Sequence, residues 1–101
     1  MGVVNDPLVK WHRAFDALGI IPDRFEWDAA TGPSVEFRHG DWRVRVHRSF
    51  RTLVYSAALT TKFITVGGNN FTHGLPARTS PKRFLTRVLA HLATRQKERE
   101  R

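Results

Sequence analysis

Residues Trp42–Arg48 constrain the fold of this chain more than any other segment. Apolar and basic side chains alternate along it, with Trp42, Val44 and Val46 on one side and Arg43, Arg45 and His47 on the other. Successive side chains of a strand point to opposite faces, so the pattern predicts a strand with one buried and one solvated face. Antiparallel sheets tolerate a solvated face, whereas parallel sheets are covered on both. The sequence therefore predicts an antiparallel sheet.

Other segments of similar composition extend this sheet into a meander of four or five strands. The remaining expected strands are Arg24–Asp28, Val35–Arg38, Thr52–Leu59 and Lys62–Val66. Clusters of Gly, Pro, Asn and Asp separate them and are typical of turns. The stretch from Gly67 to Thr79 is expected to be irregular, because it contains Gly74 and Pro76.

Two amphipathic helices are expected to flank the meander. The first covers residues 6–18, with Asp6 as N-cap, Pro7 at the first helical position and Gly19 after the end. Its expected buried face consists of Leu8, Trp11, Phe15 and Leu18. The second begins at Ser80-Pro81. Its expected buried face consists of Phe84, Leu85, Val88, Leu89 and Leu92.

The predicted fold class is α+β, with both helices packed on one face of the meander. A chain of 101 residues, 41% of them apolar, is typical of one domain with a single core. We assign residues 1–94 to this domain and residues 95–101 to a charged tail that protrudes or frays. An open edge strand also allows pairing with a second copy, so a dimer is possible.

The absence of cysteine excludes disulfides, a thiol nucleophile and cysteine-ligated zinc. The five histidines show no metal-binding spacing, so no metal or cofactor is expected. The N-terminus does not resemble a signal peptide, and no apolar run reaches the ~20 residues that span a bilayer. These observations fit a cytoplasmic protein without a membrane partner.

The net charge of +8 and the pI near 11.3 indicate an acidic partner. Arginine outnumbers lysine among the 17 cations, and arginine suits phosphates and bases. Codon usage in a GC-rich genome explains the arginine bias equally well. The charge therefore favours nucleic acid, DNA or RNA, without naming either.

The solvated face of the sheet is the first candidate site. Arg43, Arg45 and His47 share it, and cross-strand pairing is expected to add Arg38 and Glu36. Three cations and one acid favour backbone phosphates. The competing interpretation is an ordinary solvated face, but such a face usually mixes signs, and this one is expected to be short of acids.

The start of the second helix is the second candidate site. Lys82 and Arg83 occupy its first turn, and Arg78 precedes it. Cations are mildly unfavourable beside the positive end of the helix dipole, so a bound phosphate would relieve the conflict. Alternatively, these side chains simply reach into water. Arg87 extends the basic spacing, which continues through His91, Arg95 and Arg99.

Catalytic signals are weak. No nucleophile motif or phosphate-binding loop is present, so we expect no catalytic residues. A metal-free ribonuclease using His47, His73 and nearby arginines is an alternative. Among the aromatics, Phe71 is the best candidate for an exposed stacking platform, whereas the facing of Phe50, Tyr55 and Phe63 is undecided.

Residues 35–95 are similar in element order to single-strand-binding transcriptional coactivators and Whirly proteins: a meander precedes a basic helix that opens at Ser80-Pro81. The resemblance implies a single-strand binder and assigns no residue. Small basic ribonuclease toxins resemble the chain equally loosely.

The sequence favours a non-enzymatic nucleic-acid-binding protein with contacts at Arg38, Arg43, Arg45, His47, Arg78, Lys82, Arg83 and Arg87. The alternative of another class is a small bacterial or bacteriophage regulator that binds an acidic surface of another protein, such as a host or defence enzyme.

Overall fold

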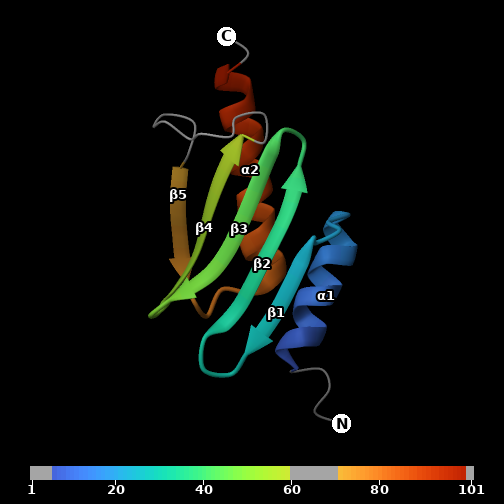
Figure 1. Ribbon diagram of the computed structural model, residues 1–101, viewed down its shortest axis with the longest axis vertical. Coiled ribbons are helices and arrows are strands. Elements are labelled where there is room, and N and C mark those ends of the chain that lie inside the picture. Colours follow the sequence, from blue (N-terminus) through green and yellow to red (C-terminus); the bar gives the residue numbers. More distant parts are fainter. Residues whose placement is uncertain (1–5, 60–70, 100–101) are drawn as a thin grey trace.

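The computed structural model describes residues 6–59 and 71–99 (Figure 1). The elements, in chain order, are α1 (Pro7–Leu18), β1 (Arg24–Asp28), β2 (Gly32–His39), β3 (Trp42–Ser49), β4 (Thr52–Leu59), β5 (Phe71–Pro76) and α2 (Pro81–Arg99). The strands form one antiparallel sheet in the order β1-β2-β3-β4-β5. The predicted α+β meander with a helix at each end is confirmed.

The fifth strand differs from the prediction. The expected strand Lys62–Val66 lies outside the described residues, and the structure forms β5 from Phe71–Pro76, in a stretch expected to be irregular. β5 pairs with β4 from Ala57↔Phe71 to Thr52↔Pro76. Glycine and proline are tolerated at this edge of the sheet, so pairing with β4 overrides their weak strand preference.

A single core fills the space between the sheet and the helices. The inward positions of β2, β3 and β4 are almost completely buried, including Val35, Phe37, Val44, Val46, Tyr55 and Ala57. Among the described residues, no polar or charged side chain other than the Tyr55 phenol is buried in this core. The opposite, outer face of these strands is exposed or half-buried, as the alternation in Trp42–Arg48 predicts.

The helix boundaries follow their caps. Asp6 Oδ1 accepts from Leu8 N at 2.9 Å, and Gly19 ends α1 in the left-handed conformation (φ 68°). Leu8 was expected on the buried face but is 41% exposed. In α2, Phe84, Leu85, Val88 and Leu92 are buried and Leu89 is partly buried. The helix continues to Arg99, so residues 95–99 of the expected tail are helical.

Both helices begin at the same end of the molecule, the lower end in Figure 1, beside the β1–β2 and β3–β4 turns. Four separate parts of the chain therefore meet there. Neither described helix is long and apolar enough to cross a membrane.

Candidate functional site

The four predicted sheet-face residues lie together on the outer face of β2 and β3. Two of them already have acidic partners. Arg45 Nε lies 2.8 Å from Glu36 Oε1, and Arg38 Nε lies 3.7 Å from Asp23 Oδ2. Arg43 has no acidic partner among the residues that the structure describes.

The outer face therefore mixes charges of both signs. On β1, Arg24 and Glu26 form a further ion pair of 3.0 Å. The expectation that this face is short of acids is wrong, because Asp23 and Glu26 come from a segment whose register the sequence did not fix. Such exposed pairs contribute about 0–1 kcal/mol to folding, but they neutralise the local field that a phosphate would feel.

The sheet-face cations and the α2 cations do not share a surface. Arg43, Arg45 and His47 point away from the core, whereas α2 packs on the opposite face of the sheet through Phe84, Leu85, Val88 and Leu92. Lys82, Arg83 and Arg87 are exposed on α2. The two candidate sites are therefore separate.

A pocket of about 330 Å³ lies at the end where both helices begin. Three cations line it: Lys10 from α1, Arg48 from β3, and Arg78 from the connection between β5 and α2. Trp11, Trp27, Pro33 and Leu53 supply apolar wall. None of the described residues that line this basic pocket is acidic.

Arg48 is placed by the end of β3. It occupies an inward position of the strand, but the sheet ends there, so its side chain is half-buried and donates a hydrogen bond to the Ala30 carbonyl. Gly32 makes room for it. A Cβ on Gly32 would lie 3.3 Å from Arg48 Cβ, and Gly32 also has a left-handed φ of 79°.

The start of α2 forms one side of the basic pocket. Ser80 and Pro81 line it, and Ser80 Oγ accepts from Arg83 N at 3.3 Å as the N-cap. The first turn of α2 contains no acid, while Lys82 and Arg83 are exposed on it. A helix N-terminus carries about +0.5 elementary charge, so the pocket combines this dipole with three full charges.

Two acids lie at the same end, and both bind backbone amides. Asp6 caps α1, and Asp28 Oδ1 accepts from Ala30 N at 2.7 Å and from Thr31 N at 3.3 Å. No ion pair joins either carboxylate to a cation within the described ranges. The charge of the basic pocket is therefore not offset by ion pairing.

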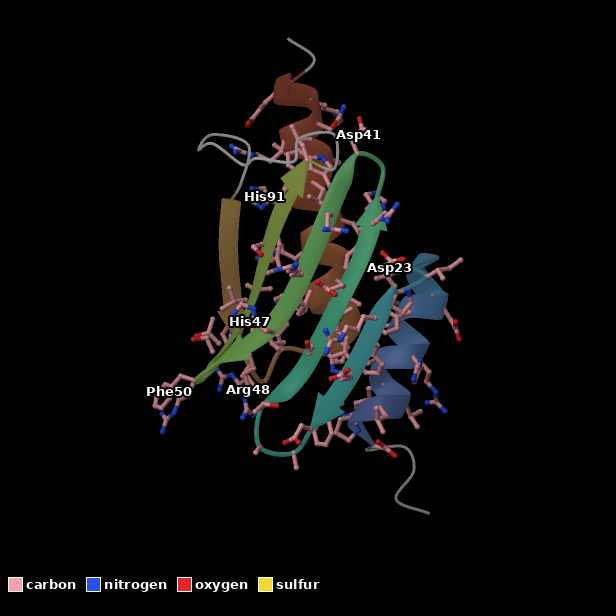
Figure 2. All side chains as sticks on the ribbon, in the orientation of Figure 1. Asp23, Asp41, His47, Arg48, Phe50 and His91 are labelled. Carbon is pink, nitrogen blue, oxygen red and sulfur yellow. The ribbon has the colours of Figure 1, made fainter. Side chains whose placement is uncertain are left out.

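The β3–β4 turn projects from this end. Ser49 and Thr52 are Cα partners, so Phe50 and Arg51 alone make the turn. Phe50 has a left-handed φ of 57° and is 86% exposed. Its side chain projects away from the ribbon at this turn (Figure 2). Arg51 Cζ lies 5.6 Å from the centroid of the Phe50 ring, and the Arg51 carbonyl accepts from Ala77 N at 2.8 Å. The turn is thus tied to the segment that carries Arg78.

The sequence did not single out Lys10 or Arg48 as site residues, and it left undecided how Phe50 of the Phe50–Arg51 turn faces. The turn has a sequence signal, because two residues separate Ser49 and Thr52 in strands of matching pattern. Lys10 and Arg48 have no such signal, because their lining of one pocket depends on where α1 begins and where β3 ends in space. The side chain of Phe71, predicted as a stacking platform, and that of His73 lie outside the described part of the structure.

Arg87 does not line the basic pocket. It lines a groove of about 420 Å³ between α2 and the β4–β5 edge, together with Tyr55, Gly74, Leu75, Ala90, His91 and Thr94. The Tyr55 hydroxyl and His91 Nδ1 form a hydrogen bond. Burial raises the pKa of Tyr55 to about 12, although the positive charge of Arg87 acts in the opposite direction.

Of the two histidines of the ribonuclease hypothesis, His47 is exposed on the outer face of the sheet. The backbone of His73 pairs with Tyr55 in the β4–β5 ladder, and its side chain lies outside the described part of the structure. Within residues 6–59 and 71–99, no cluster of three or more His, Asp or Glu side chains could hold a metal ion.

Comparison with known proteins finds no matching family, no matching curated protein and no matching solved structure.

Proposed function

We propose that this protein binds nucleic acid without acting on it chemically, and that the basic pocket holds its phosphates. One observation carries the proposal: Lys10, Arg48 and Arg78 come from three separate elements and line one pocket without an acid among its described lining residues. Like charges brought together repel each other, and a bound anion removes that repulsion.

The chemistry of the pocket suits a phosphodiester. Arginine presents a planar fork of donors that matches phosphate oxygens, and lysine adds a point charge. The N-terminus of α2 adds a favourable dipole, and exposed Lys82 and Arg83 extend the positive field beyond the pocket. The sheet-face residues Arg38 and Arg45 contribute less in this proposal, because Asp23 and Glu36 already pair with them.

Fluorescence anisotropy with labelled DNA and RNA oligonucleotides, measured over a range of salt concentrations, tests the proposal. We expect affinity to fall steeply with salt, with a logarithmic slope of about 0.7–0.9 per phosphate neutralised. Lys10→Gln or Arg78→Gln should each reduce that slope by about 1. Arg13→Gln is the matched control, because Arg13 is exposed on the same helix as Lys10 but does not line the pocket.

Absence of binding at low salt would contradict the proposal. So would equal effects of Lys10→Gln and Arg13→Gln, because net charge rather than the pocket would then govern affinity. Capture of an acidic protein that survives nuclease treatment, with no oligonucleotide binding, would favour the regulator alternative instead.

A metal-free ribonuclease is the second candidate, and the groove beside α2 is the observation that favours it. A histidine held through Nδ1 by Tyr55, with Arg87 lining the same groove, supplies groups suited to general acid–base catalysis on a phosphodiester. Incubation of labelled RNA with wild type and His91→Ala checks this candidate. Cleavage by wild type that His91→Ala abolishes would support it, and intact RNA would exclude it.

A further inference from the structure

The two-residue loop between β3 and β4 requires a positive φ at its first residue, and phenylalanine is an unusual residue at that position. A phenylalanine at φ 57° is strained, because its Cβ crowds the following carbonyl oxygen, and glycine or asparagine is usual there. Phe50 is 86% exposed, so burial in the core does not offset the strain. Strained residues of this kind cluster at sites of ligand binding.

The surroundings of the ring indicate what it contacts. Arg51 lies over it, and the Arg51 carbonyl accepts from Ala77 N, directly before Arg78 of the basic pocket. Arg48, another lining residue of that pocket, lies two positions before Phe50 on β3 (Figure 2). The exposed ring therefore has one cation, Arg51, over it, and it lies on the turn that follows Arg48 of the basic pocket. A nucleotide combines both complementary parts, because it joins a flat base to a phosphate.

We propose that the Phe50–Arg51 turn stacks on one unpaired base of the nucleic acid whose phosphates the basic pocket holds. The inference rests on the proposed function and deepens it, because it specifies a strand with an accessible base face rather than a closed duplex. A base inside a duplex is stacked on both faces and offers none to Phe50. The hydrogen bond from Ala77 N to the Arg51 carbonyl holds the turn in place, so the turn loses little conformational freedom when it binds a base.

Fluorescence anisotropy tests this with three probes of equal length: a single-stranded oligonucleotide, the same strand with abasic sites, which carries the same number of phosphates, and the matching duplex, which carries a second phosphate backbone. Phe50→Gly removes the ring and suits the left-handed turn, so the fold is retained. We expect it to weaken binding of the single strand roughly 5- to 100-fold, as loss of one base–aromatic stack does. Binding of the abasic strand and the salt slope should not change.

Two further variants separate stacking from general apolarity. Phe50→Trp keeps a stacking ring and should retain the affinity for the single strand. Ile21→Ala removes an apolar side chain that is 88% exposed and does not line the basic pocket, and it should have no effect.

The outcomes distinguish the two proposals. If wild type binds the single strand and Phe50→Gly binds it equally well, the stacking inference is wrong and the proposed function stands. An equal loss on the abasic strand would also overturn stacking. If wild type binds none of the three probes, the proposed function fails, and the inference fails with it. A Phe50-dependent protein partner without oligonucleotide binding would overturn both.

Discussion

The hydroxyl of Tyr55 is hydrogen-bonded to Nδ1 of His91, which joins β4 to α2 across 36 positions of the sequence. The rings meet edge to face, with centroids 6.0 Å apart. This contact places a polar group at the margin of an otherwise apolar core, where the groove beside α2 opens. It also gives the packing of α2 on the sheet a spectroscopic reporter, because Tyr55 is the one tyrosine of the chain.

We expect the Tyr55 phenol to lose its proton at a higher pH in the folded protein than in the unfolded chain. Burial raises the pKa of Tyr55 from its ordinary value of 10.0 to about 12. A titration followed by phenolate absorbance should therefore show a midpoint near 12 in buffer and near 10 in concentrated urea. A midpoint near 10 in buffer would show that the hydroxyl is solvated and that the contact with His91 is not stable.

The same shift has a consequence for stability. Between pH 10 and about 12 the folded protein keeps the phenolic proton while the unfolded chain has lost it. The stability associated with this group is therefore complete below pH 10 and decreases as pH rises through that window. Urea denaturation at several pH values should show a shallower decrease for Tyr55→Phe than for wild type. Parallel curves would contradict the assignment.

Gly74→Ala should destabilise the β4–β5 pairing. A Cβ at this position would lie 2.6 Å from Thr52 Cγ2 and 3.3 Å from the Leu53 carbonyl oxygen. Overpacking of this kind costs about 1–3 kcal/mol of unfolding free energy, measurable by urea denaturation. Thr52→Ser removes the colliding methyl group, so it should restore much of the loss. A double mutant as unstable as Gly74→Ala alone would show that the Leu53 carbonyl contact dominates.

Phe50→Gly should raise the unfolding free energy by about 1 kcal/mol, because glycine adopts φ near 57° without the penalty that a side chain incurs. Thermal or urea denaturation measures the change. A gain in stability together with weaker binding of single strands would identify the ring as a functional feature. A loss of stability would mean that the Arg51–Phe50 contact holds the turn together.

Charge removal on the sheet face should matter less than charge removal in the basic pocket. Arg45 already pairs with Glu36 at 2.8 Å, so its charge contributes less to the binding of an anion than the charge of Arg78 does. We expect Arg45→Gln to alter oligonucleotide affinity less than Arg78→Gln does, with folding stability changed by less than about 1 kcal/mol in each. A larger effect of Arg45→Gln than of Arg78→Gln would indicate that the nucleic acid binds the outer face of the sheet rather than the basic pocket.

The sequence predicted the element types well because their signals are local. Alternation in Trp42–Arg48 and the caps Asp6-Pro7 and Ser80-Pro81 each operate within a few residues. The prediction of irregularity was wrong at β5, because its strand conformation depends on pairing with β4 rather than on its own composition. The prediction that Leu8 is buried was wrong for a related reason. Leu8 lies in the first turn of α1, where the helix extends beyond the core.

What the sequence determined by itself was therefore the period of most segments, the starts of both helices and most of the face that each helix buries, because backbone geometry and neighbouring side chains decide these. Only the tertiary structure decided which cations pair with acidic side chains and which line one pocket together. Glu36 and Asp23 neutralise two arginines that the sequence singled out, while Lys10, Arg48 and Arg78 meet from three distant segments. Electrostatic interactions act through space over a few ångströms, and the spacing of residues along a chain does not encode that distance.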